Sequence, residues 1–331
     1  MKKVAVIGSG YIGLMHAQAI KKSKRLALAA FVNRNIQNGK KAAKEFSVPF
    51  YADAEEMIKK ENPDILDICL PSSLHEHFTL LGAAYKKHVI CEKPFSLSSA
   101  SCRRMSKACA GAGVKLMAAQ VLRWFPEYQK IKELLPKLGN LHGVYCNRLA
   151  QHPNWTTWHR DPAVSGGGLF DLHLHDIDFL YSVFGELDHV YAAGWKSPSG
   201  CWNQVMSTLV FKNGVKAVCE GCCEMTGAFP FSAALRAVGD NGTINYELSA
   251  GFNIENLGAA SNKLTLFEKG KKPKAVPWKA QDGFKAELEA FAEAVEKNTA
   301  VPISPDESIY GIKILEAIER SLETGKVEKI K

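Results

Sequence analysis

The chain has 331 residues, of which 46% are hydrophobic and 23% charged, a composition typical of a folded globular protein. This length exceeds one ordinary core and predicts two domains. The formal net charge of +8 is spread over small lysine groups such as Lys21-Lys22 and Lys271-Lys272, which indicate a solvated surface, so we expect no nucleic-acid partner.

The first third of the chain alternates short apolar strands with amphipathic helices, which is typical of a parallel sheet covered on both faces. We therefore expect residues 1–122 to form a Rossmann dinucleotide-binding domain. The predicted strands are 4–7, 26–32, 65–70, 88–91 and 115–120, and the predicted helices are 11–21, 40–46, 54–60, 74–85 and 98–112.

Residues 123–331 follow a different pattern and are expected to form a second, α/β domain. Asn213-Gly214 and Asp240-Asn241-Gly242 are strong hairpin signals, so the strands in series predict a mostly antiparallel sheet. Strands are predicted at 144–150, 190–195, 205–211, 215–223, 232–239, 243–247 and 263–267, and helices at 127–136, 166–184, 284–297 and 305–323.

A glycine pattern follows the first predicted strand and opens the first predicted helix. Its first glycine suits a tight turn, its second lets the backbone approach a pyrophosphate, and its third lets helix and strand pack. The helix N-terminus would face the phosphates with its partial positive charge. The turn, with Gly8, Gly10, Tyr11, Ile12 and Gly13, therefore predicts contacts to NAD or NADP.

The end of the second predicted strand bears on the choice between the two cofactors. An acidic residue there would bind the ribose diol of NAD, but this chain has Asn33 and Arg34. Arg34 can pair with a 2′-phosphate, which favours NADP modestly. The alternative is that Asn33 bonds the ribose of NAD while Arg34 stacks on adenine.

Two further features carry chemistry. The tripeptide Glu92-Lys93-Pro94 ends a strand of the same sheet and supplies an ammonium group where the nicotinamide is expected. Asp171 and His175 follow a run of three glycines and would share one face of an α-helix. A histidine beside a carboxylate is a plausible general base for a hydroxyl proton, although helix capping or a surface role would also explain the pair.

Taken together, the glycine turn, Pro71 with His75, Glu92-Lys93-Pro94 and the Gly-Gly-Gly-x-x-Asp-x-x-x-His run resemble the Gfo/Idh/MocA oxidoreductase family, essentially end to end. The resemblance extends to Arg123 and Pro126 after the last strand of the first domain.

The resemblance implies a Rossmann domain followed by an α/β domain with a large open, mostly antiparallel sheet. That sheet commonly serves as an oligomer interface, so a homo-dimer or tetramer is expected. It also implies hydride transfer between NAD(P) and a secondary alcohol or ketone of a sugar, inositol or related polyol.

The resemblance implies roles for individual residues as well. Lys93 matches the active-site lysine, Asp171 the motif aspartate and His175 the catalytic histidine. Pro71, His75 and Glu92 are expected near the cofactor, and the Lys93-Pro94 bond is expected to be cis.

The loop at residues 151–161 is the expected substrate-recognition segment, because aromatic rings beside amide and hydroxyl groups suit a polyhydroxylated ring. Trp155 and Trp158 are candidate stacking residues, although both would also suit packing at a domain interface. Arg123 and Arg160 are candidates for an acidic or phosphorylated substituent. His152, His159 and His173 are expected to be structural or loop residues rather than catalytic ones, and His16 and His77 receive no role.

Two other functions remain open. Some relatives oxidise a sugar hydroxyl transiently, eliminate a glycosidic substituent and restore the cofactor, and so act as glycosidases. Others bind a dinucleotide as non-enzymatic regulators, which the presence of Lys93 and His175 disfavours.

The nine cysteines are scattered and odd in number, which favours reduced thiols in the cytoplasm over a disulfide framework. Cys219, Cys222 and Cys223 lack a second ligand pair at zinc-like spacing, so no metal is expected there. The apolar run before Gly8 is too short for a signal peptide, and no stretch has the length of a membrane span.

Overall fold

A computed structural model describes residues 1–152, 156–250 and 261–331. The chain divides into two compact units, one of residues 1–124 with 281–312 and one of residues 125–280 with 313–331. Helix α9 (Gly283–Glu296) therefore returns to the first unit, an arrangement that the sequence did not indicate. The division into continuous domains at residues 122 and 123 remains a prediction.

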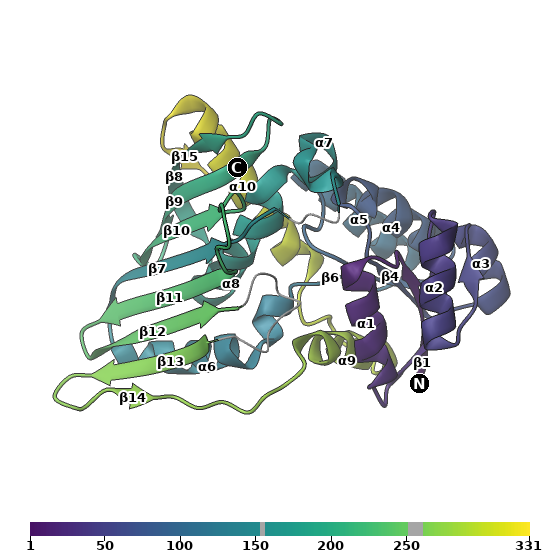
Figure 1. Cartoon of the computed structure of the whole chain (residues 1–331), viewed down its shortest axis with the longest axis horizontal. Coiled ribbons are helices and arrows are strands. Elements are labelled where there is room, and N and C mark those ends of the chain that lie inside the picture. Colours follow the sequence, from purple (N-terminus) through teal and green to yellow (C-terminus); the bar gives the residue numbers. More distant parts are fainter. Residues whose placement is uncertain (153–155, 251–260) are drawn as a thin grey trace. The chain divides into compact units, whose positions relative to one another are not determined.

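The first unit is built on a parallel sheet of six strands in the order β3-β2-β1-β4-β5-β6, of which Figure 1 labels β1, β4 and β6. The strand order reverses beside β1, between β1 and β4, and ligands of such sheets bind in the crevice at the carboxyl ends there. The strands are β1 (Lys2–Ile7), β2 (Leu26–Val32), β3 (Phe50–Tyr51), β4 (Ile65–Ile68), β5 (His88–Cys91) and β6 (Leu116–Ala118).

Apolar clusters form on both faces of this sheet, as the near-continuous apolar strands predict. Val4 and Val6 of β1 pack with residues of α1 and α9 on one face, whereas Ala5 and Ile7 pack with residues of α3 on the other. The helices are α1 (Tyr11–Lys21), α2 (Ile36–Phe46), α3 (Ala54–Glu61), α4 (His75–Ala84) and α5 (Ser99–Ala112).

Helix α2 begins four residues before its predicted start. The Asn35 side chain caps it by accepting a hydrogen bond of 3.0 Å from the Asn38 backbone N–H. Pattern alone missed this turn, because residues 36–39 carry little apolar periodicity.

The second unit contains a mixed sheet of nine strands in the order β14-β13-β12-β11-β7-β10-β9-β8-β15. Its hydrogen-bonded pairs are antiparallel except for β7 with β10, and both predicted hairpins are present. The strands are β7 (Leu141–Leu149), β8 (Leu187–Lys196), β9 (Trp202–Phe211), β10 (Lys216–Cys222), β11 (Ser232–Gly239), β12 (Gly242–Ser249), β13 (Ser261–Glu268), β14 (Lys274–Ala275) and β15 (Glu328–Lys329).

One face of this sheet is packed against helices and the other is exposed. Arg148 of β7 bonds Asp176 of α8 (Leu174–Phe184), and Tyr128 of α6 (Pro126–Leu134) stacks edge-on against Tyr246 of β12. On the opposite face, β8, β9 and β10 expose large apolar side chains, namely Tyr191, Trp195, Met206 and Val218. We call these four residues the outer patch.

Two helical segments complete the description. The helix predicted at residues 166–184 is present, but Leu169–His173 form a π-helical turn before α8 begins. The final helix, α10 (Pro305–Thr324), starts within the first unit and ends within the second. The shorter elements are α7 (Pro162–Ser165) and the 3₁₀ turns Ser72–Leu74, Val121–Trp124, Leu135–Leu138 and Trp158–Arg160.

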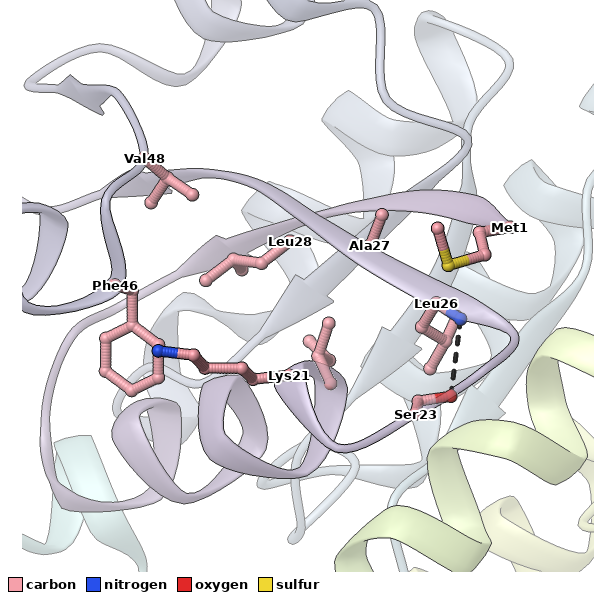
Figure 2. A pocket seen from close by; sticks show the side chains of 9 residues that line it. Met1, Lys21, Ser23, Leu26, Ala27, Leu28, Phe46 and Val48 are labelled. Carbon is pink, nitrogen blue, oxygen red and sulfur yellow. Dashed lines mark hydrogen bonds between the residues drawn. The ribbon is translucent and has the colours of Figure 1, made fainter.

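Figure 2 shows a shallow hollow at the amino ends of β1 and β2, next to the last turn of α1. Its lining is mostly apolar, and the Lys21 ammonium lies 5.8 Å from the centre of the Phe46 ring. Because dinucleotides bind at the carboxyl ends of such strands, this hollow is not the cofactor site. Among the described residues, no helix is both long and apolar enough to cross a membrane.

Candidate active site

The glycine turn connects β1 to α1. At two of its three glycines, a side chain would clash with the backbone. Gly8 has φ +107°, and a Cβ there would lie 2.2 Å from the carbonyl oxygen of Cys69. A Cβ on Gly13 would lie 2.1 Å from the carbonyl oxygen of Gly8. Glycine at these positions therefore lets β1, β4 and α1 approach closely.

Gly10 differs, because a Cβ there would meet no heavy atom within 4 Å. It is the N-cap of α1, and neither a capping side chain nor an acidic residue occupies the first turn of that helix. The start of α1 thus offers backbone N–H groups beside an open space, which is what a dinucleotide pyrophosphate requires. These residues fit NAD(P).

Asn33 and Arg34 lie directly after β2. Asn33 donates a hydrogen bond to the Ser9 hydroxyl and accepts one of 2.8 Å from the Asn35 backbone N–H, so it joins the glycine turn to the end of β2. The Arg34 side chain is exposed. The structure thus brings an amide and a hydroxyl together at the end of β2, and the exposed Arg34 follows Asn33 directly in the chain.

The turn after β5 carries Lys93, and its prolyl bond to Pro94 is cis, as expected. The Lys93 backbone N–H donates to Glu92 Oε2 over 2.9 Å. On the other side, His75 Nδ1 lies 2.9 Å from the Pro94 carbonyl oxygen and His75 Nε2 lies 2.8 Å from that of Leu70. Both His75 and Glu92 are buried, so each holds backbone around Lys93.

Pro71, the remaining predicted cofactor contact in this unit, follows β4 and accepts a backbone hydrogen bond of 2.9 Å from Leu74. Burial lowers the pKa of His75, against the effect of the carbonyl groups around it. That His75 and Pro71 touch the cofactor remains a prediction.

His16 is a residue that the sequence reading left without a role. It lies on α1, is fully buried, and contacts carboxylates through both ring nitrogens. Nδ1 lies 3.0 and 3.1 Å from the two oxygens of Asp67, and Nε2 lies 3.1 Å from Glu92 Oε1. The sequence did not indicate these contacts, because the two carboxylates that face His16 lie 51 residues or more away in the chain.

In the second unit, the π-helical turn carries Asp171 and the first turn of α8 carries His175. The prediction of one continuous α-helix is therefore wrong here. Because a π-helical turn contains more residues than an α-helical turn, the spacing of four residues does not by itself put Asp171 and His175 on one face. Both residues are partly exposed, whereas His173 and Asp176 beside them are buried.

Those buried neighbours hold the helix against the sheet. Asp176 accepts two hydrogen bonds from Arg148, 3.0 Å from Nε and 2.9 Å from Nη2, and Arg148 also donates to the Tyr128 hydroxyl over 2.8 Å. Burial raises the pKa of Asp176, and Arg148 opposes this effect. A paired, bidentate contact of this kind fixes the orientation of α8 and hence of His175.

His173 has the structural role expected of it. Its Nε2 lies 2.8 Å from the Ser207 hydroxyl, and its ring packs on Gly221, where a Cβ would lie 2.7 Å from Nδ1. Burial, assisted by the positive charge of Arg148, lowers the pKa of His173 to about 3. The ring is therefore neutral at physiological pH.

His159, which was expected to be only structural, approaches the motif aspartate. Its Nε2 lies 4.0 Å from Asp171 Oδ2, and its ring stacks on Trp158 with centroids 3.7 Å apart. The loop thus brings an aromatic face and an imidazole to Asp171. His152, in the same loop, lies 3.0 Å from Glu224.

The other predicted substrate residues have different environments. Arg123 pairs with Glu307 at 3.0 Å within the first unit, and the Arg160 side chain is exposed. Trp155 lies outside the described residues. Their contact with a substrate remains a prediction.

Both units of the chain match models of known protein families. Residues 2–120 match the model "Oxidoreductase family, NAD-binding Rossmann fold", and residues 128–245 match the "GFO/IDH/MocA C-terminal domain". Two matched models of one family thus follow each other in the order that the sequence predicts.

Several characterised proteins are similar over their whole length. A D-xylose 1-dehydrogenase (NADP(+)) of Haloferax volcanii is 26% identical, with 97% of each chain covered. A myo-inositol 2-dehydrogenase of Thermotoga maritima is 24% identical, covering 99% of this chain and 98% of the relative. The crystal structure of aldose-aldose oxidoreductase from Caulobacter crescentus has a TM-score of 0.87 at 22% identity, with 99% of each chain covered, and so shares the fold.

Proposed function

The chain belongs to the Gfo/Idh/MocA oxidoreductase family, and from this we propose that it transfers a hydride between a nicotinamide cofactor and a secondary alcohol or ketone of a sugar, inositol or related polyol. The observation that carries the proposal is the coexistence of an open pyrophosphate cradle at Gly10 with Lys93 on a braced turn of the same sheet. Relatives named as xylose and inositol dehydrogenases support the substrate class.

In this proposal, NAD(P) supplies the hydride acceptor or donor when it is bound. His175 takes the hydroxyl proton during oxidation, since an imidazole is the side chain best suited to proton transfer near neutral pH. Lys93 donates a hydrogen bond to the same oxygen and stabilises its developing negative charge. Asp171 accepts a hydrogen bond from the substrate or orients the groups around it.

For substrate recognition, we propose the segment around Trp158 and His159, with Arg160 and Trp155 nearby in sequence. The Trp158–His159 stack beside Asp171 supports this assignment, because C–H faces of a sugar ring pack on aromatic rings while its hydroxyls bond polar groups. Arg123 would have to leave Glu307, or share it, to bind an anionic substituent.

For the cofactor, we propose a preference for NADP over NAD. The exposed Arg34 and the Asn33–Ser9 pair support it, since a guanidinium beside a hydroxyl and an amide suits a 2′-phosphate. Asn33 bonding to the ribose of NAD is the alternative.

We also propose a cytoplasmic homo-oligomer, formed as a dimer or tetramer through the outer patch. Isolated exposed apolar residues are ordinary, but four large ones on three neighbouring strands suggest a covered surface. The nine cysteines are free thiols, which supports a reducing compartment. The closed-cycle glycosidase and the regulator are the alternative functions.

The test is reduction of NAD or NADP by the purified protein against a panel of inositols, aldoses and sugar derivatives. We expect turnover with one class of these substrates and tighter binding of NADP than of NAD. In Arg34→Ala, the Kd for NADP should rise about tenfold relative to the Kd for NAD. Lys93→Ala should lower turnover by about 10²–10⁴-fold while changing cofactor affinity little.

The matched control is Lys107→Ala, which removes an exposed lysine from α5. Undiminished turnover in Lys93→Ala would remove Lys93 from the mechanism. Cofactor binding without any net reduction, combined with cleavage of a glycosidic substrate, would favour the glycosidase.

A further inference from the structure

We propose that His16 is a positioning residue of this active site: as a buried, doubly paired cation it fixes Glu92, and through Glu92 it fixes the turn that carries Lys93. The proposal rests on the proposed oxidoreductase function for its kinetic consequence, but its structural core concerns the first unit alone. We call His16, Asp67 and Glu92 the buried triad.

The first step is the pairing of His16 on both sides. The imidazole lies between two carboxylates, with Nδ1 3.0 and 3.1 Å from the oxygens of Asp67 and Nε2 3.1 Å from Glu92 Oε1. The Glu92 contact is an ion pair without the alignment of a hydrogen bond. A neutral imidazole carries one N–H and presents a proton to only one of the two carboxylates, whereas an imidazolium presents a proton to each.

The second step is the charge that this environment selects. All three members of the triad are buried, so two unpaired carboxylates would be strongly destabilising. Burial lowers the pKa of His16, but Asp67 and the Cys69 thiol outweigh it and raise the pKa well above the ordinary value. Burial likewise opposes the charge of Glu92, yet His16 and Lys93 bring its pKa below the ordinary value.

The third step connects the triad to Lys93. Glu92 uses its second oxygen, Oε2, to accept the Lys93 backbone N–H over 2.9 Å, and its own N–H bonds the Ile68 carbonyl over 2.9 Å. The Glu92 carboxylate thus connects His16 on α1 to the turn that carries Lys93. His75 holds the far side of that turn through Pro94, so Lys93 is braced from two helices.

Two further titratable groups, Cys69 and Glu287, interact with the buried triad. Cys69, the residue directly after β4, lies 3.5 Å from His16 Nδ1 and 3.4 Å from Asp67 Oδ1. Glu287 from α9 accepts the backbone N–H of Gln120, and burial with the charge of Glu92 raises its pKa well above the ordinary value. Burial and the nearby Glu92 therefore both disfavour a further negative charge on Glu287 beside the triad.

One alternative uses the same atoms. His16, Asp67 and Cys69 each offer a ligand atom within 4.8 Å of the others, which is a candidate set for a metal ion. The contacts of 3.0–3.1 Å between His16 and Asp67 are those of a direct hydrogen bond, and Glu92 occupies the other ring nitrogen. The geometry therefore favours a proton, and a metal is an outcome that the test must expose.

The first measurement reads the charge of His16 in the full-length protein. Protein labelled with ¹⁵N at histidine and lysine is examined by ¹H–¹⁵N NMR from pH 6 to 9, with His16→Gln used to assign the ring signal. We expect a doubly protonated ring at pH 7, and slow exchange of the Lys93 amide proton that is lost in His16→Gln and Glu92→Gln. A neutral His16 at pH 7, or stoichiometric zinc in the purified protein, would overturn the proposal.

The second measurement reads the consequence. His16→Gln and Glu92→Gln should each lower kcat by roughly 10–100-fold, and His16→Gln should change cofactor Kd less than about threefold. Because His16 acts through Glu92, the double variant should be no slower than the worse single variant. The control is His77→Gln, which replaces an exposed helix histidine of α4.

The two readouts separate the two proposals. A charged His16 with a protected Lys93 amide, in a protein that reduces no cofactor, would sustain the triad and reject the oxidoreductase function. Activity that is unchanged in folded His16→Gln, or multiplicative losses in the double variant, would reject the positioning role while leaving the function intact. Circular dichroism confirms that each variant is folded.

Discussion

At the scale of single residues, identical glycines in one turn perform different tasks. Gly8 and Gly13 are required because a Cβ would strike backbone carbonyl oxygens at 2.2 and 2.1 Å. Gly10 faces open space instead, so its missing side chain leaves room for a ligand rather than for the protein. The motif alone cannot distinguish these reasons.

This difference predicts opposite results for two alanine variants. Gly10→Ala should keep the fold, with stability lowered by less than about 1 kcal/mol, while NAD(P) affinity falls about tenfold or more. Gly13→Ala should destabilise the fold by about 1–3 kcal/mol, because the helix must move away from the turn. Thermal unfolding and cofactor titration measure both. Equal effects of the two variants on stability would contradict the assignment.

Two fully buried histidines also show how partners decide charge. His16 lies between carboxylates and its pKa is raised, whereas His173 faces the Ser207 hydroxyl near Arg148 and its pKa falls to about 3. Burial acts against the charged form in both cases. The charge of the neighbours is what differs.

The low pKa of His173 predicts a specific pH dependence of stability. Between pH 6.5 and about 3 the unfolded chain binds a proton at this residue and the native protein does not, so unfolding becomes easier as pH falls. The slope from this group is about 1.4 kcal/mol per pH unit and vanishes above pH 7. Denaturant unfolding of His173→Gln from pH 7 to 5 should lack this contribution. An unchanged slope would contradict it.

At the scale of elements, the helix that carries His175 is held by a buried ion pair. Arg148, Asp176 and Tyr128 join β7, α8 and α6 through hydrogen bonds of 2.8–3.0 Å. The pair stands directly beside the proposed base, so its integrity bears on both folding and activity. The π-helical turn before it sets where Asp171 and His175 lie along the chain.

Breaking this pair from one side should be costly. Asp176→Leu leaves the Arg148 charge buried without its partner, and the free energy of unfolding should fall by about 3–5 kcal/mol. The double variant Arg148→Met with Asp176→Leu removes both charges and should recover much of the loss. Denaturant unfolding measures this. A double variant as unstable as Asp176→Leu would show that packing, not charge, is responsible.

At the scale of the molecule, the two units expose different surfaces. The second unit presents the outer patch of Tyr191, Trp195, Met206 and Val218 on neighbouring strands, each at least 42% exposed. A sheet that is packed on one face and exposes several large apolar side chains on the other is a suitable surface for a second copy of the chain.

Charge placed on this patch should therefore change assembly. We expect Met206→Glu to dissociate the proposed homo-oligomer, whereas Leu80→Glu, on the exposed side of α4, should leave it intact. Burying a glutamate without a partner in an interface is strongly unfavourable. Light scattering after size-exclusion chromatography measures the mass. A wild-type monomer would contradict the proposed assembly.

Local sequence determined much of this protein. The strand–glycine–helix start, the hairpins at Asn213-Gly214 and Asn241-Gly242, and the alternation of elements follow from residues that are neighbours in the chain, because turns and periodicity are short-range properties. The family motifs likewise singled out Lys93, Asp171 and His175, whose catalytic roles remain a proposal.

Only the tertiary structure decided which buried polar groups meet. Asp67 reaches His16 across 51 residues, Glu287 returns on α9 to the Gln120 backbone across 167, and His159 comes to Asp171 through a loop. Such pairs depend on how strands and helices are stacked, and no local pattern encodes them. The charge of a buried side chain follows from those partners, so it too is a property of the folded chain.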